Sequence, residues 1–76
     1  MNDESIQLLK SCVDKSAKIH CSDGEILTAR IIFVWDEYGD VTFDIISTNR
    51  PEKYESFPAG SAHTINLSDI TSVEIV

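Results

Sequence analysis

The chain has 76 residues and a mass of 8.5 kDa, about half of the ~150 residues of a typical domain, which predicts one domain over residues 1–76 and excludes a two-domain enzyme. Thirteen acidic and six basic residues give a formal net charge of −7, which opposes the attraction to phosphate that dominates most nucleic-acid binding. A chain this short removes only about 60% of its unfolded surface from water, so contacts with other chains are expected to contribute to its stability.

The cysteines and the first residues bear on location and on metal binding. Cys12 and Cys21 allow one disulfide or none, and the start of the chain lacks the basic residues and apolar run of a signal peptide. We therefore expect free thiols, a cytoplasmic protein and no membrane association. Together with His20 and His63, the cysteines do not have the spacing of a zinc site, so no metal and no cofactor is predicted.

The first predicted element is a helix over residues 4–14. Apolar residues recur at spacings of three and four and form one face: Ile6, Leu8, Leu9, Cys12 and Val13. Asp3 suits the N-cap, and Glu4 suits the positive end of the helix dipole. A helix of about three turns is marginally stable alone, so this face is expected to pack on the rest of the chain.

From residue 16 onward the pattern alternates with a period of two and predicts strands. The predicted strands cover residues 16–21, 25–35, 41–46, 63–67 and 70–76. Asp23-Gly24 is a typical hairpin turn, and residues 36–40 form a second turn. Residues 48–60 contain both prolines and predict an irregular loop, in which Tyr54 and Phe57 either extend the third strand or pack against the sheet.

The second strand is the longest and predicts how the sheet curves. One face carries Leu27, Ala29, Ile31, Phe33 and Trp35, and the other turns from polar to apolar at Ile32 and Val34. Burial on one side at the start and on both sides later is expected where a strand bends around a barrel. The predicted fold is therefore mostly β, an N-terminal helix followed by a five-stranded, strongly bent antiparallel barrel over residues 16–76 that is closed or nearly closed, because closure removes exposed strand edges.

This order of elements resembles the Sm-like family of LSm and Hfq-type proteins, whose domain is an SH3-like barrel. Residues 18–25 carry a strand and an Asp-Gly turn, residues 36–40 match the family turn Asp-x-aromatic-Met-Asn in spacing, and residues 65–70 occupy the final two-strand motif. The family's Arg-Gly turn is absent here, and so is a glycine in the bent strand. The interval from Asp23 to Asp36 is one residue longer than usual, which requires a bulge or a register change. Other small SH3-like barrels remain the alternative fold.

The resemblance implies a non-catalytic, homo-oligomeric ring that binds single-stranded nucleic acid, with RNA favoured, in RNA processing or regulation. In such a ring the fourth strand of one copy pairs with the fifth strand of the next. The last strand is apolar and lacks the prolines and lysines that protect an edge, which is consistent with that pairing. The expected interface residues are Ile65, Leu67, Val73 and Ile75.

The resemblance also implies three nucleic-acid-binding residues, Tyr38, Asp40 and Asn66. Tyr38 stands where the family stacks an aromatic ring on a base, or else covers the end of the barrel. Asp40 replaces an asparagine that reads a base edge; its carboxylate favours an amino donor such as cytosine N4, or else stabilises its own turn. Asn66 replaces an arginine, so it can bond to a base without attracting phosphate, or it serves turn geometry.

Catalysis is not predicted from this sequence. Ser61 and His63 lie two residues apart on a strand with no nucleophile elbow, and His63 is expected to be a partly buried packing residue. The alternative function is a ring whose RNA site is degraded and which acts as a protein-assembly scaffold. The net charge, the missing arginine and Asp40 favour this alternative. The candidate partners are thus a second copy of the chain, single-stranded RNA or another protein.

Overall fold

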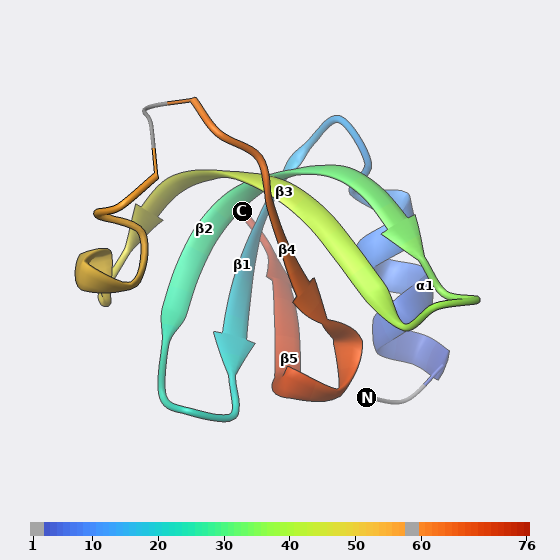
Figure 1. Cartoon of the computed structure of the whole chain (residues 1–76). Helices are drawn as coiled ribbons and strands as arrows, with labels where there is room; N and C mark the ends of the chain where they lie inside the picture. Colours follow the sequence, from blue (N-terminus) through green and yellow to red (C-terminus); the bar gives the residue numbers. More distant parts are fainter. Residues whose placement is uncertain (1–2, 58–59) are drawn as a thin grey trace.

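The computed structural model describes residues 3–57 and 60–76 as one helix followed by a curved sheet (Figure 1). The elements are α1 (Asp3–Ser11), β1 (Ser16–Cys21), β2 (Ile26–Trp35), β3 (Asp40–Thr48), β4 (His63–Asn66) and β5 (Ile70–Ile75), with short 3₁₀ turns η1 (Pro51–Lys53) and η2 (Leu67–Asp69). The five strands form one antiparallel sheet in the order β4-β3-β2-β1-β5. The predicted fold class is confirmed, and β4 and β5 are the two edges of the sheet.

The helix ends three residues earlier than the apolar pattern predicted. Asp14 adopts the left-handed conformation with φ of 67°, which an α-helix does not accommodate. Its N–H donates to the carbonyl of Ile31 at 2.8 Å, and the N–H of Ile31 donates to the carbonyl of Lys15 at 3.0 Å. Hydrogen bonds to β2 therefore replace the last helical turn. No helix in the described part of the chain is long and apolar enough to cross a membrane.

A bulge in β2 decides which of its side chains are buried. Ile31 pairs with Phe43 and Phe33 with Thr42, so Ile32 is an extra residue in β2. The extra residue inverts the alternation, since Val34 is buried whereas Phe33 and Trp35 are 46% and 44% exposed. The predicted irregularity in this strand is confirmed. The prediction that Phe33 and Trp35 share the buried face of the earlier residues is wrong.

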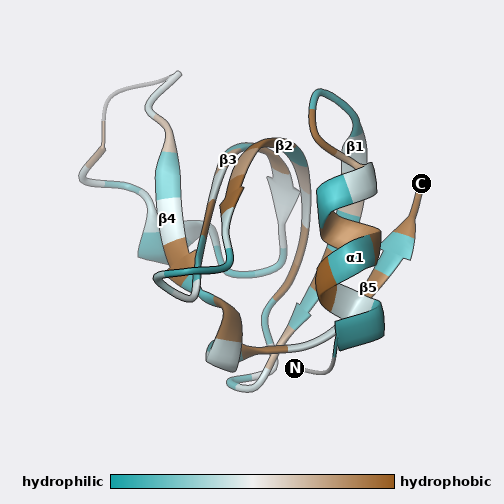
Figure 2. Ribbon diagram, turned by 90° about the vertical axis from the view of Figure 1, so that its right-hand side faces the viewer, coloured by the Kyte–Doolittle hydropathy of each residue, from teal (hydrophilic) through white to brown (hydrophobic). Residues whose placement is uncertain are grey.

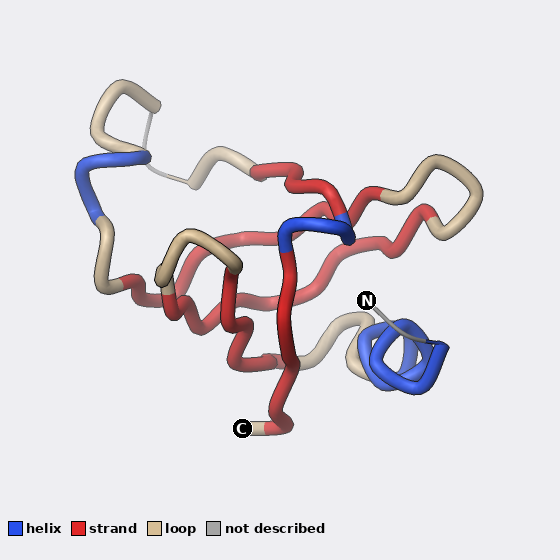
Figure 3. The backbone as a smooth tube through the Cα atoms, turned by 90° about the horizontal axis from the view of Figure 1, so that it is seen from below, coloured by secondary structure: helices blue, strands red, loops and turns tan. Residues whose placement is uncertain are grey.

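The core lies inside the curved sheet and beneath α1. Its buried apolar side chains come from α1 and the turn after it, from all strands but β4, and from η2; the largest fully buried ones are Phe43, Leu9, Ile19, Leu27 and Ile31. α1 packs against β2 and β5 (Figure 2), and viewed from below it lies to one side of the strands, which curl around the interior (Figure 3). Full burial of each large side chain contributes about 1.5–3 kcal/mol, which is how so short a chain maintains the fold.

Candidate ligand-binding face

Two turns from distant parts of the sequence meet at one end of the sheet. The turn between β2 and β3 is closed by the N–H of Tyr38, which donates to the carbonyl of Trp35 at 3.1 Å, and Gly39 has a φ of 73° that favours glycine. The carbonyl of Gly39 accepts the N–H of Leu67, at the start of η2, at 2.6 Å. Asp40 and Asn66 are direct cross-strand partners. The structure thus brings together the three residues predicted to bind nucleic acid.

Three exposed aromatic rings, Phe33, Trp35 and Tyr38, follow one another along this end of the sheet; we call them the aromatic row. The centroids of Phe33 and Trp35 are 4.3 Å apart, and those of Trp35 and Tyr38 are 5.9 Å apart. Tyr38 is 73% exposed, more than either of the others. Of the three rings, Tyr38 alone was predicted to be exposed at a site, because the alternation along β2 placed Phe33 and Trp35 on its buried face.

The aromatic row borders a shallow depression of about 310 Å³, lined by Trp35, Tyr38, Asp40, Thr42 and Thr64. The hydroxyls of Thr42 and Thr64 lie 3.2 Å apart and hydrogen-bond to each other. In the described part of the chain, no donor bonds to the half-buried carboxylate of Asp40. Asn66 is exposed and does not line the depression, so Tyr38 and Asp40 are the predicted residues at its wall.

The charges around the aromatic row are mainly negative. Lys10 pairs with Asp36, which lowers the pKa of that carboxyl, and Arg30 pairs with Asp44 at 2.7 Å. Glu37 and Asp40 are left without an ion pair among the described residues. The face therefore combines stacking surfaces with acceptor groups and has little to attract phosphate.

A second polar cluster, around Glu25, was missed by sequence reasoning. The side chain of Glu25 is fully buried and accepts hydrogen bonds from Lys53 Nζ at 2.7 Å, Thr48 Oγ1 at 2.6 Å and Tyr54 OH at 2.8 Å. Burial raises the pKa of Glu25, but these hydrogen bonds outweigh it and hold the pKa below its usual value. Glu25 lies two residues before Leu27 and four before Ala29, both buried, and this alternation was the available signal that Glu25 faces inward.

This cluster fastens the segment after β3 to the hairpin between β1 and β2. Lys53 also pairs with Asp23 at 3.0 Å, and the guanidinium of Arg50 donates to the Asp23 carbonyl at 3.1 Å. The side-chain carbonyl of Asn49 accepts the N–H of Ile26 at 2.8 Å. Of the two predicted alternatives for residues 48–60, the described part is a packed loop that includes η1.

His63 packs among aromatic rings, as predicted. The centroid of its ring lies 4.9 Å from that of Tyr54, 5.0 Å from that of Phe57 and 6.2 Å from that of Phe43. Its side chain is half-buried, and Ser61 precedes β4. These contacts give His63 a packing role next to the loop.

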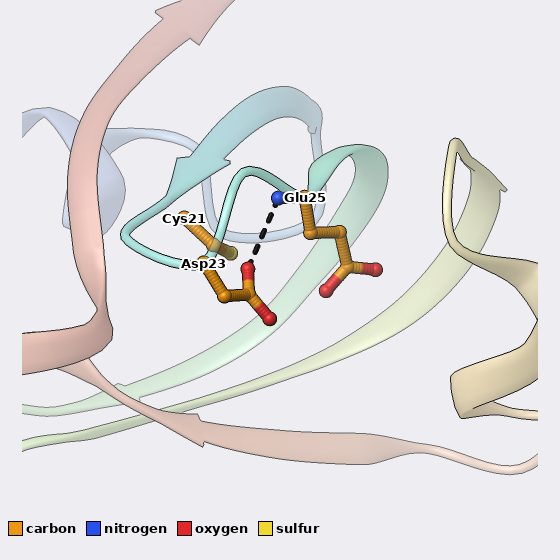
Figure 4. Close-up of side chains that lie close together, drawn as sticks. All are labelled: Cys21, Asp23 and Glu25. Carbon is orange, nitrogen blue, oxygen red and sulfur yellow. Dashed lines mark hydrogen bonds between the residues drawn. The ribbon is translucent and has the colours of Figure 1, made fainter.

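Cys21, Asp23 and Glu25 are the group of potential metal ligands in the described residues, with ligand atoms within 4.8 Å of one another (Figure 4). The ammonium of Lys53 already contacts both carboxylates. Burial, with the charges of Glu25 and Asp23, raises the pKa of the Cys21 thiol to about 11, so the thiol is protonated at neutral pH and a weak ligand. The Lys53 ammonium therefore balances the charge of these two carboxylates.

The two sheet edges carry the residues predicted to form an interface between copies. Ile75 is 69% exposed, and Ile65 and Val73 are half-buried. Leu67 is only 5% exposed in η2, so its side chain belongs to the core and is not available to a second copy. A register shift between His20 and Cys21 makes Thr71 an extra residue in β5, and this turns Val73 partly toward the core.

Comparison with known proteins supports the fold. No protein-family model and no curated protein matches the sequence. Among solved structures, the chain is similar to the SmAP (LSm) protein from Methanococcus vannielii, with a TM-score of 0.66 over 97% of each chain at 9% sequence identity. A likeness over nearly the whole length at so low an identity reports shared architecture and leaves the side-chain roles to be argued from this chain. The chain has the Sm-like fold that the order of its elements predicted.

Proposed function

We propose that this protein is a non-catalytic, ring-forming Sm-like protein that binds single-stranded nucleic acid, with RNA as the polymer, through the aromatic row. The observation that supports the proposal is the exposure of three aromatic rings, each in contact with the next, beside carboxylates that have no ion pair among the described residues. Stacking of a base on an exposed aromatic ring contributes about 1–3 kcal/mol per base. We place this role in RNA processing or regulation in the cytoplasm, where the free cysteines remain thiols.

The proposed affinity comes from bases more than from phosphates. Lys10, Arg30 and Lys53 are already paired with carboxylates, and Asn66 cannot supply the charge of an arginine. A site that neutralises few phosphates has a shallow dependence of affinity on salt concentration.

The proposed ring would use the two edges of the sheet. β4 and β5 each have one neighbour, and Ile75 and Val76 are 69% and 70% exposed at the end of β5. Pairing of β4 with β5 of the next copy would satisfy both edges, and a head-to-tail contact of this kind closes into a ring.

Tyr38→Ala tests the nucleic-acid site. We expect the substitution to weaken the binding of short RNA oligonucleotides about tenfold, because one stacking contact is lost. Native mass spectrometry should show an unchanged assembly. Phe57→Ala is the matched control, since Phe57 is also an exposed aromatic residue but lies in the loop after β3, 5.0 Å from His63 between ring centroids. Equal affinity of Tyr38→Ala and the unsubstituted protein would remove Tyr38 from the site.

The second candidate function is a protein-assembly scaffold built on the same fold. The observation that favours it is the presence of Glu37 and Asp40, both without an ion pair in the described residues, beside the aromatic row. Their charge repels phosphate and attracts a cationic partner. Under this candidate no oligonucleotide binds at low salt, where electrostatic attraction to phosphate is strongest.

A further inference from the structure

We propose that the depression beside the aromatic row binds arginine side chains from an unstructured, arginine-rich segment of a partner protein. The inference rests on the second candidate function and names the chemistry of its partner. A nucleobase and a guanidinium are both planar and can both stack on aromatic rings, so the rings alone do not distinguish them. The charge and the hydrogen-bonding groups of the depression distinguish a guanidinium from a nucleobase.

The aromatic lining fits a guanidinium. Trp35 and Tyr38 line the same depression with their rings tilted by 56°, and each is exposed. A cation over the face of a tryptophan or tyrosine ring is attracted by about 0.5–2 kcal/mol, and arginine makes such contacts more often than lysine.

The polar lining fits a group that only donates hydrogen bonds. Asp40 presents two carboxylate oxygens without a donor from the described residues, and the hydroxyls of Thr42 and Thr64 lie beside it. A guanidinium has five N–H donors and no acceptor, and it bonds to a carboxylate with two parallel hydrogen bonds. A nucleobase brings acceptors of its own and a phosphate next to them.

The charges around the depression also favour a cationic occupant. The chain has a net charge of −7, and Lys10 and Arg30 are paired with Asp36 and Asp44. No cation among the described residues pairs with Glu37 or Asp40, which adjoin Tyr38 in the turn beside the depression. Such a field attracts a cationic segment and speeds its encounter, and it repels a polyanion.

The size of the depression indicates a flexible segment as the occupant. About 310 Å³ accommodates a side chain rather than a folded domain. In the proposed ring each copy would present one such depression, so a segment with repeated arginines could engage several copies and gain affinity from their combined contacts.

The experiment uses the fluorescence of Trp35, the one tryptophan of the chain, which lines the depression. The full chain is titrated with a short peptide in which arginine alternates with glycine, with a matched lysine peptide, and with a single-stranded RNA oligonucleotide. We expect the arginine peptide to change the emission saturably and to bind about tenfold more tightly than the lysine peptide, because only arginine offers bidentate bonds and ring stacking.

Two substitutions distinguish binding in the depression from non-specific attraction of the peptide to the acidic surface. Asp40→Asn is expected to weaken binding of the arginine peptide about tenfold or more, the effect of losing a charge-assisted hydrogen bond. Glu52→Gln removes the same charge from η1, which Figure 1 shows at the far end of the sheet from the turn between β2 and β3, and should leave affinity nearly unchanged. Circular dichroism and native mass spectrometry confirm that both variants fold and assemble.

Each outcome decides the inference. Arginine selectivity that Asp40→Asn reduces and Glu52→Gln does not reduce supports it, whether or not RNA competes for the same site. Equal binding of the two peptides, or equal losses in the two variants, overturns it. Binding of RNA without the arginine peptide overturns it and leaves the nucleic-acid function standing, whereas binding of neither overturns both.

Discussion

Glu25 shows at the scale of one residue how burial creates a structural role. Its carboxylate is excluded from water, and an ammonium, a hydroxyl and a phenol donate to it. A buried charge is tolerated only where such partners are present. Thr48 is the last residue of β3, and Lys53 and Tyr54 come from the segment that follows it, so this one side chain holds that segment on the hairpin.

Glu25→Gln is expected to lower the free energy of unfolding by about 1–3 kcal/mol, because charge-assisted hydrogen bonds are lost and the Lys53 ammonium loses a buried partner. Urea denaturation measures the change. Glu52→Gln serves here also as the control, because Glu52 is exposed and a surface substitution of this kind changes stability by only about 0.5 kcal/mol. Equal stability of the two variants would mean that the Glu25 cluster does not hold the loop.

The lowered pKa of the same carboxyl predicts how the free energy of unfolding depends on pH. The pKa of Glu25 is lowered from 4.5, and that of Asp23 is lowered from 3.8, chiefly by the backbone N–H of Glu25 and then by Lys53. A lowered pKa in the folded state contributes stability that is present above the unfolded value and is lost as the pH falls through the folded value. We therefore expect the free energy of unfolding to fall below about pH 4.5, and to fall less in Glu25→Gln. Identical pH profiles for the two proteins would contradict this assignment.

At the scale of the element, β2 shows where sequence patterns succeed and fail. Its existence and its length were predicted from β-branched residues and from the turns at its two ends, and the need for a bulge or a register change from comparison with the Sm-like family pattern. The position of the bulge at Ile32 was not predicted, because it depends on how β2 pairs with β3. One extra residue moves every later side chain to the opposite face, and so places Phe33 and Trp35 on the outside.

The edge strand β5 carries the prediction for assembly. Ile75→Lys is expected to abolish the proposed ring, because a charge at an exposed apolar position of β5 opposes burial against a second copy. The monomer should still fold, since Ile75 is 69% exposed. Native mass spectrometry and circular dichroism measure the two properties separately.

Ile46→Lys is the control for this substitution. Ile46 is 58% exposed on β3, an interior strand of the sheet. The Ile46→Lys protein should therefore assemble as the unsubstituted protein does. An intact assembly of Ile75→Lys would argue against pairing through the end of β5.

At the scale of the whole molecule, a thin core and an acidic surface shape what the protein can do. The curved sheet and α1 enclose one apolar cluster, and most charged groups lie outside it. The net charge of −7 makes the surface a poor match for phosphate and a good match for cations. The Sm-like fold is compatible with the proposed ring, and the charge pattern of this chain favours cationic ligands at its exposed aromatic face.

The sequence by itself determined the order of the elements, the two tight turns and the placement of Tyr38, because hydrophobic period and turn chemistry act between near neighbours. Only the tertiary structure decided the outward position of Phe33 and Trp35, the joining of Asp40 to Thr64 in one depression and the pairing of Glu25 with Lys53, 28 residues away. These features depend on register between strands and on contacts across the fold. Local sequence patterns carry no information about contacts between residues so far apart, so the proposed binding face could be recognised only in the folded chain.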